Sequence, residues 1–322
     1  YMKKAGTLFL MLALLLRFTP VCRAEQEITL VSLGDSIARG YGCQPEEAYG
    51  SLLADYIGGL GMPAPFQVRY VNYGTDGDTA ADLLEKLTGR EDVRASVRAA
   101  DILTISVGGN DLIHQLSDLM PAQGDSVIGN VAKLLTALGQ GLSESRSLEV
   151  FQQFRNDMEA ILQLLDTLSP HALVILTTIP NPTSDAAVGP LIDRYLERFN
   201  DYIRSGCGRT RGIIPAVADC SRAFASYTGE EALTFAHIDW SDLRTLSLDP
   251  HPTPAGHQVM AQTHIPLLED RLVEIRTAWL KTDLPERQEE SRASLLRRLL
   301  PPMALLAAVF LLWALLPRRR HI

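Results

Sequence analysis

The sequence predicts an α/β fold, a three-layer α/β/α sandwich around a central, mostly parallel sheet of five strands. Short apolar runs of strand length alternate with stretches of helix length from about residue 27 to residue 280, which is typical of a parallel sheet covered by helices. Glycine-bearing polar segments follow these runs, at the carboxyl ends where open α/β sheets bind ligands. The chain has 322 residues, 46% of them hydrophobic, which is enough apolar material for such a core.

Each expected strand is rich in apolar, β-branched or aromatic residues. The five segments are 28–33, 66–73, 102–107, 173–179 and 213–218. The fourth is continuously apolar, as expected for a strand buried on both faces. The expected helices are 48–57, 80–87, 91–98, one that begins at Leu112, 148–168, 191–203 and 255–280. Thr79 and Asp78 are the two candidate N-caps for the helix at 80–87.

The first expected strand ends abruptly in Gly34-Asp35-Ser36. All three are common turn residues, so on their own they indicate only a turn. A serine at the end of a buried strand nevertheless presents its hydroxyl at the edge of the sheet, where ligands bind. Glycines before it and after it, at Gly40 and Gly42, let the backbone bend closely around that hydroxyl. Ser36 is therefore a candidate site residue.

A loop of about thirty residues after the last expected strand leads to His251, and loops of that length are usually functional. A histidine in a loop is by itself most often a surface residue. Here Pro250 and Pro252 flank it and stiffen the backbone that aims the ring. His251 is therefore a second candidate site residue, and His257, inside the last expected helix, is its competitor.

Four short motifs together resemble the blocks of the SGNH, or GDSL-type, hydrolases. In the family's order they are Gly34-Asp35-Ser36, the loop 72–79 around Gly77, Gly108-Gly109-Asn110-Asp111 and His251-Pro252-Thr253. Each closes an expected strand or opens the final helix, whereas the Gly-x-Ser-x-Gly elbow of the α/β-hydrolases is absent. The resemblance implies an SGNH-type fold and an esterase or lipase acting on carboxylic esters, with no metal or organic cofactor.

The resemblance also implies a role for each matching residue. Ser36 would be the nucleophile and His251 its base. The backbone N–H groups of Ser36 and Gly77 and the side-chain amide of Asn110 would form the oxyanion hole. Asn110 would otherwise be a helix N-cap, and Asp111 is the better candidate for that cap or for bracing the loops.

One position departs from the family. Its pattern has an aspartate three residues before the histidine, where this chain has Leu248. Asp249 lies only two residues before, with Pro250 between. Either Asp249 orients the imidazole through a bent loop or a backbone carbonyl does so; Asp242 is a third, weaker candidate.

The two ends have the composition of targeting segments. Residues 1–24 predict a signal peptide, with a basic start and a short apolar run. Residues 281–298 predict a charged stalk, 299–316 a single transmembrane anchor, and 317–322 a basic cytoplasmic tail. We therefore expect the domain at 25–280 to lie outside the cytoplasm, held to the cell membrane by one span.

Charge and cysteine content limit the partners. Without the seven Lys and Arg at the two ends, the net charge of −8 becomes −15 for the portion between. Such an acidic domain argues against nucleic-acid binding, which needs clustered Lys and Arg. Cys22 would be removed with the signal peptide, so three cysteines remain. Cys207 and Cys220 could pair in an oxidising compartment, and Cys43 would then be a free thiol. No spacing of Cys and His resembles a zinc site.

Together these features predict a membrane-tethered serine hydrolase that cleaves lipid acyl esters or carbohydrate O-acetyl esters through an acyl-serine intermediate. Residues 121–145 look like an insertion that would set acyl-chain length if it overhangs the site. Two alternatives stay open: an O-acyltransferase that passes the acyl group to a cell-surface glycan, and a surface binding module that has lost catalysis. The altered aspartate spacing is the only support for the second.

Overall fold

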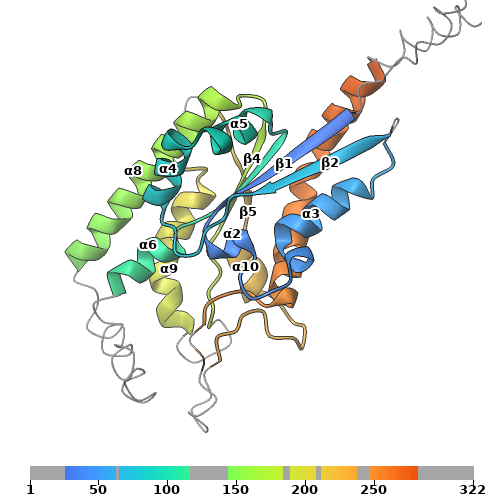
Figure 1. Ribbon diagram of the computed structural model, residues 1–322. Helices are drawn as coiled ribbons and strands as arrows, with labels where there is room; N and C mark the ends of the chain where they lie inside the picture. Colours follow the sequence, from blue (N-terminus) through green and yellow to red (C-terminus); the bar gives the residue numbers. More distant parts are fainter. Residues whose placement is uncertain are drawn as a thin grey trace, which may run out of the picture.

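The computed structural model describes residues 26–62, 65–116, 144–183, 189–207, 212–237, 247 and 249–281. Its centre is a five-stranded sheet in the order β2-β1-β3-β4-β5, and every neighbouring pair of strands is parallel (Figure 1). The strands are β1 Gln26–Gly34, β2 Phe66–Asn72, β3 Ile102–Ser106, β4 Leu173–Thr177 and β5 Ala216–Ala218. The predicted α/β sandwich with five strands is therefore confirmed.

Helices cover both faces of the sheet (Figure 1). Alternate residues of β1 divide between the faces, with Ile28 and Leu30 in one apolar cluster and Val31 and Leu33 in the other. The face that bears Val31 packs against α4 Ala80–Gly89, α5 Glu91–Ala99, α8 Glu144–Leu168 and α9 Gly189–Arg204. The face that bears Ile28 packs against α3 Tyr49–Gly58, α10 Cys220–Ala225 and the helix at 254–281. All residues of β3 are buried, as expected for a central strand of a sheet that is covered on both faces.

Several bounds differ from the predicted ones. The strand predicted at 213–218 is observed only over Ala216–Ala218, because Pro215 has no N–H to donate to the sheet. The helix expected from Leu112 begins earlier, as α6 Gly109–Leu116. Two short helices at the first turn, α2 Ser36–Arg39 and the 3₁₀ helix η1 Pro45–Glu47, were not predicted, because neither is long enough to show a period in the sequence.

The pairing of Cys207 with Cys220 that the sequence leaves open is not present, because both are free thiols in the structure. Cys207 belongs to the apolar cluster under α8 and α9, and Cys220 to the cluster on the opposite face of the sheet. Burial raises the pKa of the Cys207 thiol to about 12. Both cysteines therefore pack as small apolar side chains.

Several predicted segments lie outside the described residues. They are the signal peptide 1–24, the insertion 121–145 up to residue 143, Asp242, the stalk beyond residue 281, the anchor 299–316 and the tail 317–322. Within the described part of the chain, no helix has the length and apolar composition needed to cross a membrane.

Candidate active site

The backbone at the end of β1 places Ser36 at the edge of the sheet. Gly34 has a φ of +135°, and a Cβ on it would lie 1.8 Å from the carbonyl oxygen of Ser106 at the end of β3, so only glycine fits. Asp35 donates its N–H to that same carbonyl, at 3.0 Å. Ser36 follows as the first residue of α2, and it is almost fully buried.

Asp35 caps α2, since its Oδ1 accepts the N–H of Ile37 at 2.9 Å. Burial raises the pKa of the Asp35 carboxyl to about 7, and the nearby charge of Asp111 adds to the rise, while the N–H groups of Ile37 and Ala38 oppose it. The cap holds the first turn of α2, and with it the serine, in a fixed orientation.

The structure brings His251 to Ser36, although 215 residues separate them in the sequence. The ring atom Nε2 of His251 lies 2.9 Å from Ser36 Oγ, and its Nδ1 lies 2.5 Å from Asp249 Oδ1. A carboxylate can only accept, so Nδ1 carries the proton and Nε2 is the acceptor for the serine hydroxyl. This is the arrangement that a nucleophile, its base and an orienting carboxylate require.

Asp249 reaches the ring in spite of the altered spacing because the loop bends. Its Oδ1 also accepts the backbone N–H of His251, at 3.1 Å, which closes a turn of the Asx type. Of the two alternatives at Nδ1, the structure places the Asp249 carboxylate there.

A second segment holds the histidine loop from behind. Phe235 donates its N–H to the carbonyl of His251, and Thr253 donates its N–H to the carbonyl of Leu233, both at 3.0 Å. Thr234 and Pro252 form an isolated antiparallel bridge between these two contacts. The long loop after β5 thus folds back and fixes the backbone that carries the imidazole.

His257, the competing candidate base, lies elsewhere. It is fully buried, and its Nδ1 accepts the N–H of Tyr49 at the start of α3, at 3.4 Å. Burial lowers the pKa of His257 to about 4, against a smaller opposing effect of the Tyr41 carbonyl. His257 is therefore a neutral, buried histidine that joins the helix at 254–281 to α3. The interpretation of His257 as the base is wrong.

Two of the three candidate oxyanion donors, Gly77 and Asn110, lie on segments that a hydrogen bond joins. Gly77 has a φ of +84° with open space where a side chain would be. Asn110 lies in the first turn of α6 and donates an Nδ2 hydrogen to the carbonyl of Asp78, at 2.9 Å. The amide carries a second N–H, which is the one that an oxyanion would use.

Asp111 braces the same loops. Its carboxylate accepts the N–H of Ala80, the first residue of α4, at 3.0 Å. The N-cap of α4 is Thr79, which forms a capping box with Asp82. The contact with Ala80 agrees with the bracing role predicted for Asp111. Of the two candidate caps of α4, Thr79 is the observed one and Asp78 is not.

Two neighbours of the site escaped the sequence analysis. Tyr41 lies with its ring centroid 4.2 Å from that of His251, at an angle of 35°. Asn72 donates Nδ2 to the carbonyl of Ala38 and accepts the N–H of Gly74 at Oδ1, both at 2.8 Å, so it ties α2 to the loop that leads to Gly77. The only signals were an aromatic residue between two glycines and an asparagine at the end of a strand, and neither specifies a role.

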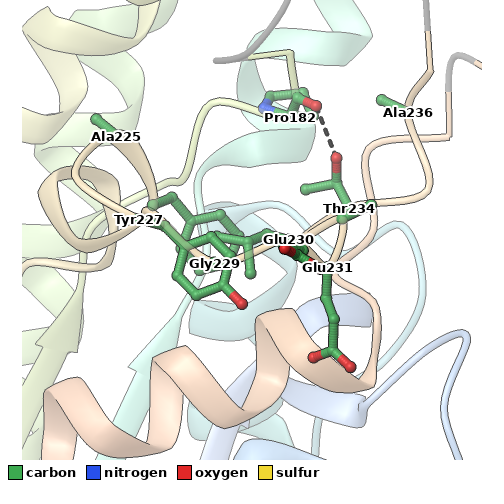
Figure 2. A pocket seen from close by; sticks show the side chains of 11 residues that line it. Pro182, Ala225, Tyr227, Gly229, Glu230, Glu231, Thr234 and Ala236 are labelled. Carbon is green, nitrogen blue, oxygen red and sulfur yellow. Dashed lines mark hydrogen bonds between the residues drawn. The ribbon is translucent and has the colours of Figure 1, made fainter.

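A cavity of about 300 Å³ lies beside the segment that supports His251 (Figure 2). Its wall includes Thr234, whose Oγ1 donates to the carbonyl of Pro182 at 2.7 Å (Figure 2). Thr234 and Ala236 line this cavity, whereas Phe235 between them packs against Gly42 on the turn after Ser36. The cavity is therefore behind the histidine loop and not at the serine.

The family is decided by a match to the whole segment that carries these motifs. The model of the GDSL-like lipase/acylhydrolase family matches residues 32–259, which include Ser36, Gly77, Asn110, Asp249 and His251. The chain belongs to this family. It is accordingly an enzyme of the esterase and lipase class, with the SGNH-hydrolase fold.

Several solved structures are similar to this chain at low sequence identity. The lipase Lip_vut3 from a goat rumen metagenome is 18% identical, with a TM-score of 0.50, and the match covers 73% of this chain and 95% of that one. Phospholipase A1 from Streptomyces albidoflavus NA297 is 17% identical, with a TM-score of 0.47, over 76% of this chain and 98% of that one. The acetyl xylan esterase AlAXEase is 18% identical, with a TM-score of 0.47, over 75% of this chain and 100% of that one. No curated protein matches the sequence.

Among the described residues, no three His, Cys, Asp or Glu side chains gather closely enough to hold a metal ion. Ser36, His251 and Asp249 form a chain of a hydroxyl, an imidazole and a carboxylate, which can activate the serine for nucleophilic attack.

Proposed function

We propose that the chain is a serine hydrolase that cleaves carboxylic esters through an acyl-Ser36 intermediate. The observation that carries the proposal is the continuous contact from Ser36 Oγ to His251 Nε2, at 2.9 Å, and from His251 Nδ1 to Asp249 Oδ1, at 2.5 Å. Both distances lie within or close to the range that proton transfer requires.

The first half of the reaction forms the acyl-enzyme. His251 Nε2 takes the proton of the Ser36 hydroxyl as Oγ attacks the ester carbonyl, and the imidazolium that forms is stabilised by Asp249. The N–H groups of Ser36 and Gly77 and the second Nδ2 hydrogen of Asn110 bind the oxyanion, each typically worth about 2.7–4 kcal/mol of the barrier. Nε2 then donates its proton to the leaving alcohol oxygen as the ester bond breaks.

The second half releases the acid. Water replaces the alcohol, His251 Nε2 removes one of its protons, and the resulting hydroxide attacks the acyl carbon. The same proton returns to Ser36 Oγ when the acyl bond breaks. The enzyme is restored, and no cofactor takes part in this sequence.

The structure weakens one alternative. The interpretation as a binding module that has lost catalysis depended on the altered aspartate spacing. The contact between Asp249 and the His251 ring removes that support, because the carboxylate reaches Nδ1 from two residues away.

The proposed substrates are lipid acyl esters or carbohydrate O-acetyl esters, and the proposed location is the outer side of a cell membrane. The apolar segment 299–316 with its following arginines supports a single-pass anchor. Protease treatment of intact cells should remove the domain at 25–280 and leave the membrane fraction with a short fragment. A domain that stays protected would contradict this location.

Labelling and turnover together test the reaction. A fluorophosphonate should add once to the folded protein, at Ser36, and p-nitrophenyl esters of graded acyl length should be hydrolysed. Ser36→Ala should lose both, while Ser226→Ala, at an exposed serine outside the site, should keep both. Hydrolysis that persists in Ser36→Ala, or a wild type that neither labels nor hydrolyses any ester, would refute the proposal.

A further inference from the structure

Among the exposed large apolar side chains of the described chain, two lie at the candidate site. The set comprises Tyr41, Leu148, Ile214, Phe235, Val273 and Leu280. Tyr41 is 39% exposed and follows α2, the helix of Ser36, while Phe235 is 37% exposed and lies on the segment that supports His251. Large apolar groups left open to solvent beside a reactive centre are typical of ligand contacts.

Both residues are held against the loop of His251, Tyr41 through its ring and Phe235 through its backbone N–H. The Tyr41 ring lies 4.2 Å from the imidazole, centroid to centroid, and its backbone N–H donates to the carbonyl of Ser36 at 2.9 Å. Phe235 donates its N–H to the carbonyl of His251, and its ring lies so close to Gly42 that a Cβ there would be 2.6 Å from Cε2. The two aromatic side chains therefore flank one turn, 41–42, and the loop of the base.

Tyr41 has a second support. The guanidinium of Arg39 lies 5.5 Å from its ring centroid and is itself paired with Asp76, at 2.6 Å. A ring held in this way loses little conformational freedom when a ligand packs on it. Its exposed area is thus available for binding at low entropic cost.

The chemistry determines which part of an ester meets these rings. During acylation, His251 Nε2 must donate a proton to the leaving oxygen, so that oxygen lies within hydrogen-bond distance of the imidazole. The substituent on it, the alcohol portion, must then extend past the imidazole, where Tyr41 and Phe235 lie. The acyl chain is a different substituent of the tetrahedral carbon and extends in another direction, so it does not contact Tyr41 and Phe235.

We propose that Tyr41 and Phe235 form a binding subsite for the alcohol portion of the substrate, and that it selects esters of aromatic alcohols over esters of small aliphatic ones. This inference rests on the proposed function, because it needs His251 as the proton donor. Offset or edge contacts between aromatic rings, together with the buried apolar area, should raise kcat/KM for an aromatic alcohol about tenfold or more.

The test compares benzyl and ethyl esters of one acyl group, the one that the p-nitrophenyl series shows to be hydrolysed best. Both alcohols are poor leaving groups of similar basicity, and both esters give the same acyl-enzyme. A difference in kcat/KM therefore reports binding of the alcohol during acylation. We expect the wild type to prefer the benzyl ester about tenfold or more.

Three variants locate the effect. Phe235→Ala should lower kcat/KM for the benzyl ester about tenfold and for the ethyl ester less than threefold, and Tyr41→Ala should show the same selective loss. Ile214→Ala, at a side chain 83% exposed, should leave the preference unchanged. Tyr41 touches the imidazole, so its removal can displace the base. The rate at which fluorophosphonate labels Tyr41→Ala shows whether His251 has moved. Phe235→Ala does not need this control, because the Phe235 ring makes no ring contact with the imidazole.

The outcomes separate the two proposals. A wild type that hydrolyses p-nitrophenyl esters but treats benzyl and ethyl esters alike overturns the subsite. A benzyl preference that survives both Phe235→Ala and Tyr41→Ala overturns it as well. Loss of the proposed function itself would appear differently, as absence of Ser36 labelling and of p-nitrophenyl ester hydrolysis.

Discussion

Asp249→Asn isolates the charge of the orienting carboxylate. Both contacts of Asp249 with His251, to ring Nδ1 at 2.5 Å and to the backbone N–H at 3.1 Å, use the same oxygen, Oδ1. An asparagine that places its Oδ1 there keeps both hydrogen bonds and the bent loop. What it removes is the negative charge beside the imidazolium that forms when Ser36 attacks.

The size of the loss follows from that charge pair. Unit charges about 4 Å apart interact by about 4 kcal/mol at an effective dielectric constant of about 20, and by about half that at about 40. The Asp249 side chain is 39% exposed, so the larger dielectric constant also applies to part of its surroundings. A loss of about 2–4 kcal/mol is a fall of about 30- to 1000-fold in kcat/KM, less than the roughly 10⁴-fold loss known for a buried carboxylate in this role.

The assay is hydrolysis of a p-nitrophenyl ester, with circular dichroism to show that the variant is folded. Asp92→Asn is the matched control, because Asp92 is an exposed carboxylate in an ion pair with Arg90 and far along the chain from the site. It should stay within about twofold of wild type, as surface ion pairs contribute little. If Asp249→Asn also stayed within about threefold, the carboxylate would have no part in catalysis, and the argument from Oδ1 would be wrong.

Three further predictions concern the loops around Ser36. Asn110→Ala should lower kcat about 10²- to 10³-fold, because it removes the N–H proposed to bind the oxyanion. It also removes the hydrogen bond to the Asp78 carbonyl, so circular dichroism should first show that the variant is folded; a change in KM alone would contradict the prediction. Asp35 binds its proton up to a pKa of about 7 in the folded protein but only to 3.8 when unfolded, so the wild type should lose stability as pH rises from about 4 to 7. Asp35→Asn has no carboxyl at this position and therefore does not lose this stability. In urea unfolding, the free energy of unfolding of Asp35→Asn minus that of the wild type should increase by up to about 4 kcal/mol from about pH 4 to pH 7. A difference that does not change with pH would contradict the raised pKa of Asp35. Gly34→Ala should give no folded protein, since its Cβ would lie 1.8 Å from Ser106 O. Gly77→Ala has a φ of +84° but open space around the Cβ, so it should lower the free energy of unfolding in urea by only about 1–2 kcal/mol. Equal losses of stability in the two variants would refute this distinction.

Most of the fold could be predicted from the sequence, because the signals that specify it are local. The apolar run predicted at 173–179 became β4, Leu173–Thr177, with four of its five residues buried, since a continuous apolar run is stable only between two covered faces. The strand at 213–218 was predicted too long, because its apolar pattern continues across Pro215, which has no N–H to donate to the sheet. An apolar pattern alone does not register that missing donor.

The candidate site divides in the same way. Ser36 and His251 could be found because turn residues and flanking prolines alter the backbone at their own positions. The choice of Asp249 over a backbone carbonyl needed the conformation of the loop, since an aspartate two residues before the histidine reaches its ring only if the turn between them is tight. Tyr41 carried no signal of its own, because its significance is its distance to a ring in a remote part of the chain.

By itself the sequence determined the order of strands and helices, the serine at the end of the first strand and the family to which the chain belongs. These properties depend on which residues are neighbours along the chain. The tertiary structure alone decided that Cys207 and Cys220 lie on opposite faces of the sheet, that His257 is buried, and that Tyr41 and Phe235 flank the base. Those properties arise from packing, which sets distances between residues that no spacing in the sequence relates.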